Sequence, residues 1–156
     1  MGTKSSLIRI TQLIILSDQN QNPLVLVPES TAKLLKKISG KSTGTNDDLI
    51  YCHLYGVVGD WYLSEISEDR DTAFGFQLIN SEPVWEMDNW LTNSKEWGEI
   101  PIKQLQKLVN EKFLKEKDIR FLITRDLFWK PIKFSEINNI EQNTLFYPGT
   151  TDRTFS

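Results

Sequence analysis

The chain has 156 residues, which corresponds to one domain with its own hydrophobic core. With 39% hydrophobic and 25% charged residues it is globular in composition, and no stretch reaches the roughly 18 apolar residues that a membrane helix needs, so we expect no membrane insertion. The net charge of −3 and the pI of about 5.2, without a dense run of lysine and arginine, argue against direct nucleic-acid binding.

The first forty residues predict two strands and a helix. The stretch 7–16 is rich in Ile and Leu, alternates in part and favours a strand. No small-residue cleavage site follows it, so we do not expect a signal peptide. A polar turn leads to a short strand at 24–27. A helix is then predicted over 28–40, with Gly40 as its stop. Its apolar side carries Ala32, Leu34, Leu35 and Ile38.

The middle of the chain predicts an antiparallel meander of three strands. These strands cover residues 49–58, 61–66 and 72–79. Gly59-Asp60 is the expected tight turn between the first two, and the acidic stretch 67–71 is the expected turn between the second and third. Gly75, inside the third strand, indicates a bulge or a close approach of two backbones.

The second half begins with an irregular stretch at 81–97 that is rich in tryptophan and acidic residues. Packing onto the sheet and exposure as a contact surface both explain its tryptophans, Trp85, Trp90 and Trp97. The clearest helix is predicted at 100–117. Five apolar residues at steps of three and four define its buried side: Ile102, Leu105, Leu108, Val109 and Phe113. A strand at 119–124 follows, and the chain becomes polar from Asn138 onward.

Together these elements predict an α+β fold, an antiparallel sheet of five to six strands packed against two helices. We expect a single globular domain over 1–140 and a loose C-terminal tail over 141–156. The only cysteine, Cys52, lies in an apolar run and is expected to be a buried, inert thiol. Since secreted domains of this size more often carry paired cysteines, we expect a cytoplasmic protein.

Motifs of the common catalytic and metal sites are missing. The sequence has no GxxxxGK[ST], GxGxxG, CxxC or HExxH pattern, and one histidine with one cysteine excludes a structural zinc site. His53 follows Cys52 directly, so on a strand the two point to opposite faces and make a poor catalytic pair. We therefore expect no enzyme, no cofactor and no metal site.

Charge is distributed unevenly along the chain. Residues 45–100 hold two basic and twelve acidic side chains, whereas both flanking segments are net positive. One interpretation is a solvated acidic face of no special role. The other is an acidic patch that docks onto a basic partner or imitates the charge of nucleic acid.

The most distinctive run is 125–131, RDLFWKP. Arg125 could pair with a carboxylate of the acidic turn and hold the last strand in place. Alternatively, Arg125 with Phe128 and Trp129 could grip a phosphate or a base. The structural role is favoured.

Several of these runs, in this order, resemble a bacterial family of small proteins of unknown function that occurs on plasmids, phages and integrative elements. The resemblance covers about 28–137. It rests on the N-terminal helix at 28–35, the strand with Trp61 and Glu65, the acidic turn followed by Phe74-Gly75, the step into the helix at 97–105, and the closing TRDLFWKPIKFSEI. Thr124 departs from the family pattern, which often has Glu there. The resemblance implies a fold and a genetic setting but no reaction.

The leading hypothesis is a non-catalytic binding or accessory protein that docks on a larger protein or assembly. The residues expected to bind the partner are Glu65, Asp69, Asp71, Trp85, Trp90, Trp97, Arg125, Asp126 and Trp129. One alternative is a counter-defence or regulatory factor of a mobile element with a nucleic-acid-mimicking acidic face. The other is a small metal-dependent hydrolase that uses Glu65, Asp69, Asp71 and Asp126.

Overall fold

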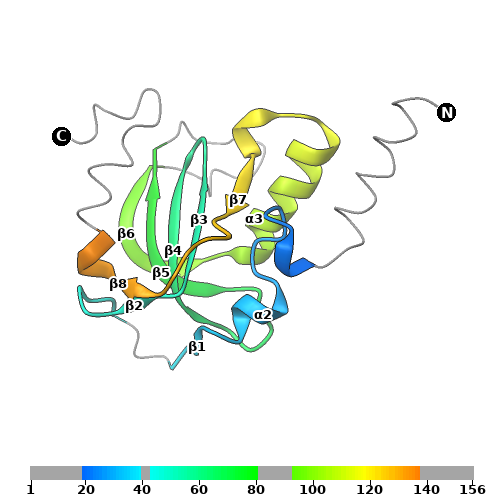
Figure 1. Ribbon diagram of the computed structural model, residues 1–156. Helices are drawn as coiled ribbons and strands as arrows, with labels where there is room; N and C mark the ends of the chain where they lie inside the picture. Colours follow the sequence, from blue (N-terminus) through cyan, green and yellow to red (C-terminus); the bar gives the residue numbers. More distant parts are fainter. Residues whose placement is uncertain (1–18, 40–42, 81–92, 138–156) are drawn as a thin grey trace.

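The computed structural model describes residues 19–39, 43–80 and 93–137 (Figure 1). Six strands form the main sheet: β1 (Lys36–Lys37), β3 (Cys52–Gly56), β4 (Gly59–Ile66), β5 (Ala73–Ile79), β6 (Ser94–Ile100) and β7 (Ile123–Arg125). Their order is β6-β5-β4-β3-β7, every neighbouring pair is antiparallel, and β1 adds to β4 in parallel. A separate pair joins β2 (Leu49–Ile50) to β8 (Ile132–Lys133). The predicted α+β class is confirmed.

Helical segments are short apart from one. They are η1 (Gln19–Gln21), α2 (Glu29–Ala32), α3 (Ile102–Leu108), its π-helical continuation η3 (Val109–Lys115) and the 3-10 turn η4 (Ile119–Phe121), and residues 134–137 form one further helical turn. The helix predicted at 100–117 is therefore confirmed, since α3 and η3 run on without a break. Pro101 takes the N-cap position of α3, where its missing N–H is no loss.

The first face of the sheet, on which Trp61 and Leu63 lie, carries the main core. Alternation along β4 directs these two side chains to one side and Tyr62 to the other. Helix α3 with its continuation η3 covers the first face, as Figure 1 shows. Of the five apolar residues that the spacing predicted, four are buried and Phe113 is partly buried. Fully buried members of this core include Leu26, Leu54, Trp61, Leu63, Ile66, Ile100, Leu105 and Phe121.

The second face, on which Tyr62 and Phe76 lie, carries a smaller and more aromatic cluster. Its buried members are Ile50, Tyr62, Phe76, Leu78, Phe134 and Ile137. Residues 125–137, which we call the closing segment, supply Phe134 and Ile137 and place β8 and Trp129 against this face. The closing segment therefore covers the second face of the sheet, which helix α3 does not cover.

The predictions for the 24–39 region are wrong. Residues 24–27 form turns and bends rather than a strand, and the helix predicted over 28–40 ends after Ala32. Leu34, expected on its buried side, is 57% exposed. The chain instead forms β1 beside the last residues of β4, with Lys36 opposite Glu65. The pairing of β3 with β4 stops at Leu63, so β1 satisfies backbone groups of β4 that β3 leaves open.

Two further boundaries differ from the prediction. The turn between β3 and β4 is Val57-Val58, and Gly59-Asp60 belong to β4. The strand predicted at 119–124 begins with η4 and becomes β7 only at Ile123. The acidic turn at 67–71 is confirmed, since it joins β4 to β5. The close approach at Gly75 is confirmed too, because a Cβ on this residue would collide with the Tyr62 carbonyl oxygen beside a bulge in β4. The strand predicted at 7–16 lies outside the described residues.

Candidate functional site

The second face of the sheet holds a histidine between two carboxylates. His53 on β3 and Asp60 on β4 lie on the same face, and Nε2 of His53 donates a hydrogen bond of 2.8 Å to Oδ1 of Asp60. Nδ1 of His53 lies 4.0 Å from Oδ2 of Asp126, which follows β7. His53 is 6% exposed and Asp60 is 1% exposed. These three residues are called the His53 cluster below.

Aromatic rings enclose the imidazole of His53. Tyr62 stacks on it with a centroid distance of 4.6 Å and an interplanar angle of 4°, and Tyr55 stacks on it at 5.3 Å. Trp129 lies tilted against it, at 5.0 Å. The rings hold the orientation of the imidazole, so both of its nitrogens stay directed at carboxylates.

The protonation of His53 follows from two opposing influences. Burial acts most strongly and lowers the pKa of His53, but the carboxylates of Asp126 and Asp60 together outweigh it and raise the pKa above its usual 6.5. In return, interaction with His53 lowers the pKa of Asp126. The geometry therefore favours an imidazolium held between two carboxylates.

The thiol of Cys52, the sequence neighbour of this histidine, does not share its face of β3. Cys52 belongs to the first face, as the alternation predicted, and burial raises the pKa of its thiol to about 12. A thiol that stays protonated at neutral pH is a poor nucleophile. Within this arrangement, the His53 cluster helps to fix the position of Asp126.

Asp126 begins a tight turn, residues 126–129, whose backbone is fixed at several points. Its N–H donates to the His53 carbonyl oxygen at 2.9 Å, and its Oδ1 accepts from the Phe128 N–H at 2.9 Å. At the other end, Nε1 of Trp129 donates to the Ile50 carbonyl oxygen at 3.0 Å. The tip of this turn is apolar, because Leu127 and Phe128 are both exposed and Phe128 is 90% exposed.

Arg125 anchors the turn from the other side and is itself buried. Its guanidinium donates to the carbonyl oxygens of Asn20, Asn22 and Val25 and to the hydroxyl of Thr31, at 3.0 to 3.4 Å. The predicted pairing with the acidic turn is therefore wrong. The reason is that β7 ends beside the 20–31 segment, so the Arg125 guanidinium lies next to backbone carbonyl oxygens that need hydrogen-bond donors. A structural role for Arg125 is confirmed.

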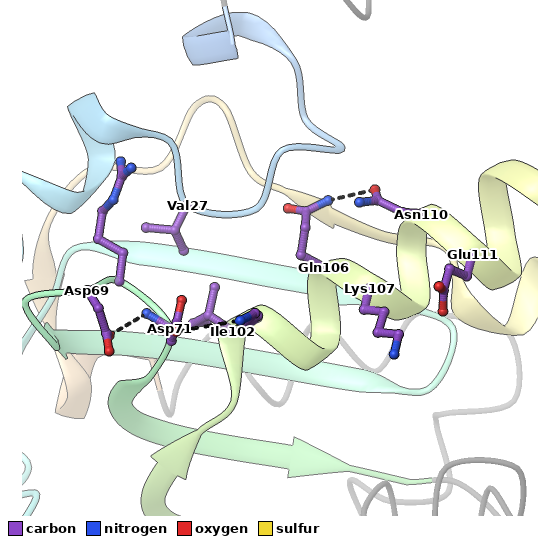
Figure 2. A pocket seen from close by; sticks show the side chains of 10 residues that line it. Val27, Asp69, Asp71, Ile102, Gln106, Lys107, Asn110 and Glu111 are labelled. Carbon is purple, nitrogen blue, oxygen red and sulfur yellow. Dashed lines mark hydrogen bonds and ion pairs between the residues drawn. The ribbon is translucent and has the colours of Figure 1, made fainter.

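The acidic turn lies at a different place, along an open cleft of about 550 Å³ (Figure 2). Its charged lining consists of Asp69, Arg70 and Asp71 of the turn and of Lys103, Lys107 and Glu111 of α3 and η3. Oδ2 of Asp71 lies 4.0 Å from Nζ of Lys103. The Ser67 hydroxyl donates to Asp69 at 2.6 Å and lowers the pKa of that carboxyl. One lysine distant in sequence, Lys103, thus offsets part of the charge of the turn.

The structure does not bring the predicted carboxylates together. Glu65 lies on β4 beside a small hollow that Lys36 and Asp48 also line, and Asp126 lies in the His53 cluster. Within the described ranges, no group of three or more His, Cys, Asp or Glu side chains is placed to hold a metal ion.

Of the predicted tryptophans, Trp97 packs onto the sheet. Its ring lies 4.8 Å from that of Phe134 and 5.8 Å from that of Phe76, at the margin of the second-face cluster. Trp85 and Trp90 lie outside the described residues. Three of the predicted partner-binding residues, Arg125, Asp126 and Trp129, lie together around the 126–129 turn.

Sequence analysis did not count His53, Asp60 or Phe128 among the residues expected to bind a partner, and it named Phe128 only in the alternative role of gripping a phosphate or a base. His53 and Asp60 flank the β3–β4 turn, and their meeting could be foreseen only with the turn placed at Val57-Val58. Phe128 lies inside the run that sequence analysis singled out, but aromatic residues of this kind are usually buried. Its exposure depends on the turn that Asp126 fixes.

Comparisons with models of protein families, with curated proteins and with solved structures gave no match to the chain. The resemblance to the mobile-element family therefore stays a prediction. Among the helices that the structure describes, none is both long enough and apolar enough to cross a membrane.

Proposed function

We propose that this chain is a non-catalytic binding protein that docks on a larger protein through the 126–129 turn. The observation that carries the proposal is Phe128, an aromatic side chain 90% exposed on a turn whose backbone is fixed by hydrogen bonds. Large apolar side chains that are ordered before binding lose little conformational freedom when they are buried in a partner. Such residues are typical anchors of protein interfaces.

The surroundings of the tip define the chemistry of the partner. Leu127 extends the apolar surface, and the exposed Lys130 and Lys133 follow it in the closing segment. The one carboxylate of the turn, Asp126, is directed at His53. The tip is therefore apolar with basic neighbours, and it fits a partner that has an apolar pocket with an acidic rim.

The acidic turn is the weaker docking surface, because Asp69 and Asp71 share their cleft with Lys103 and Lys107. The alternative of a nucleic-acid-mimicking factor needs a surface of uncompensated negative charge, and this arrangement lends it less support. The alternative of a metal-dependent hydrolase has no cluster of ligands in its favour within the described ranges.

The test compares two exposed apolar residues by affinity capture from the host. The tagged chain is used as the wild type, as Phe128→Ala and as Leu34→Ala, a control that removes an apolar side chain 57% exposed on another segment. We expect the wild type and Leu34→Ala to capture the same partner in stoichiometric amount. Phe128→Ala should weaken binding at least tenfold, in line with the roughly 2 kcal/mol that anchor residues contribute.

Circular dichroism and thermal unfolding of the three proteins control for folding. Equal capture by the wild type and a folded Phe128→Ala would contradict docking through the turn. Loss of capture in an Asp69→Asn, Asp71→Asn double variant, with Phe128→Ala unaffected, would move the interface to the acidic turn.

A further inference from the structure

Strand β6 is the long outer strand of the main sheet (Figure 1). It pairs with β5 over its whole length, from Ser94 opposite Ile79 to Ile100 opposite Ala73. In the part of the chain that the structure describes, nothing pairs with its other side. An antiparallel strand directs half of its N–H and C=O groups to each neighbour, so β6 offers a row of backbone donors and acceptors to a further strand.

A second copy of β6 can pair with the first only in certain registers. Two identical antiparallel strands related by a two-fold axis must be centred on one residue, because hydrogen-bonded and non-hydrogen-bonded pairs alternate. Centres at Lys95, Glu96 or Glu99 set a charged residue directly against its own copy, and like charges in that position destabilise a strand pair. A centre at Gly98 sets Lys95 against Pro101, which has no N–H to donate.

A register centred at Trp97 sets no like charges opposite each other and no proline within the paired residues. All seven residues of β6 then overlap, and Lys95 of each copy lies directly opposite Glu99 of the other. Both side chains are exposed, and neither takes part in an ion pair among the described residues. Opposite charges directly across from each other stabilise a strand pair, and this register forms the contact twice.

Trp97 supplies an apolar contact at the same centre. It lies on the same face as Lys95 and Glu99, because all three are odd members of the alternation. Its ring is half-buried at the sheet margin, where it packs on Phe134 and lies close to Gly44. Pairing about Trp97 sets the two Trp97 residues directly opposite each other across the axis, between the two charge pairs. Opposite Glu96, Gly98 presents no side chain, and its Cβ position meets nothing within 4 Å.

We propose that two copies of this chain form a two-fold symmetric dimer by antiparallel pairing of their β6 strands about Trp97, with Lys95 of each copy opposite Glu99 of the other. The dimer joins two sheets into one continuous sheet. It leaves both 126–129 turns free, so it is independent of the docking proposed above.

Sedimentation velocity of the full chain over a concentration series tests the proposal. We expect the wild type to shift from monomer to dimer with increasing concentration. Lys95→Glu and Glu99→Lys each set like charges opposite one another and should weaken association at least tenfold. The double variant K95E/E99K restores both pairs in reverse order and should regain the dimer. Lys115→Glu, an equal change of charge on the helix, should leave association unchanged.

A wild type that stays monomeric at every concentration would overturn the proposal. So would single variants that dimerise as the wild type does, or a folded double variant that does not recover. Oxidation of a Lys95→Cys, Glu99→Cys double variant gives a second readout. We expect a covalent dimer, because the two cysteines face each other across the axis and the native Cys52 is buried. Absence of this cross-link in a dimeric sample would assign the dimer to another surface.

Discussion

The two faces of the sheet are built from the same strands but are covered in different ways. The first face is aliphatic around Trp61 and lies under α3, with one continuous core. The second face combines aromatic rings with a buried polar pair, His53 and Asp60, and the closing segment covers it. Neighbours in sequence therefore have different roles, since Cys52 and Trp61 belong to one face and His53 and Tyr62 to the other.

The two faces therefore have different roles: the first mainly stabilises the domain, and the second mainly positions the turn proposed for recognition. A face of aliphatic side chains under a helix contributes most of the apolar burial that stabilises the domain. The buried polar groups of the second face need specific hydrogen-bond partners, so they fix the positions of the residues around them. Here they position Asp126 and thereby the turn that carries Phe128. The three predictions below test this division, beginning with the one that should change stability most.

Loss of a large side chain should cost more on the first face than at the margin of the second. Trp61 is completely buried, so Trp61→Ala should lower the free energy of unfolding by about 3–5 kcal/mol. Trp129 is half-buried and keeps one hydrogen bond, so Trp129→Ala should cost about 1–2 kcal/mol. Urea unfolding of both variants measures the two values. Equal losses would show that the second face contributes as much stability as the first.

A paired substitution compares an interior position with the sheet margin. Gly75 on β5 and Gly98 on β6 are directly opposite each other. A Cβ at Gly75 collides with the Tyr62 carbonyl oxygen, so Gly75→Ala should destabilise the protein by about 2–4 kcal/mol. Gly98→Ala meets open space and should change stability by less than about 0.5 kcal/mol. Thermal unfolding checks both, and similar melting temperatures would refute the close approach at Gly75.

The smallest effect concerns the polar pair of the second face. The folded state raises the pKa of His53, so the folded protein binds this proton more tightly than the unfolded chain does. This contribution to stability is complete below pH 6.5, the pKa of an unperturbed histidine, and is lost as the pH rises through the raised value. The unfolding free energy of the wild type should therefore decline as the pH rises above 6.5. His53→Gln should flatten that decline, and an unchanged slope would argue against a charged His53.

Local patterns predicted the meander and α3, because alternation and steps of three and four report directly on burial. Local patterns failed at 24–39, because the helix signal there comes from neighbouring residues, whereas the conformation that forms depends on contacts with residues distant in sequence. The open end of β4 recruits Lys36 and Lys37, and Arg125 holds the chain at Val25. No window of neighbouring residues contains that information.

The candidate site was predictable in part for a similar reason. Arg125, Asp126 and Trp129 stood out as a run, and the structure brings them together. The acidic turn also stood out, but charges counted along the chain omit Lys103, which approaches Asp71 only in the folded state. Gly59-Asp60 has the composition of a turn, yet Asp60 is taken into β4, where it hydrogen-bonds to His53.

The reach of Arg125 has a consequence for synthesis on the ribosome. Its bonds to Val25 and Asn20 span 100 and 105 residues of sequence. At a translation rate of roughly 5–20 residues per second, the 20–25 segment waits about 5–20 seconds for its partner to be made. During that interval its carbonyl groups must be solvated by water. The domain can therefore be completed only after residue 125 has been synthesised.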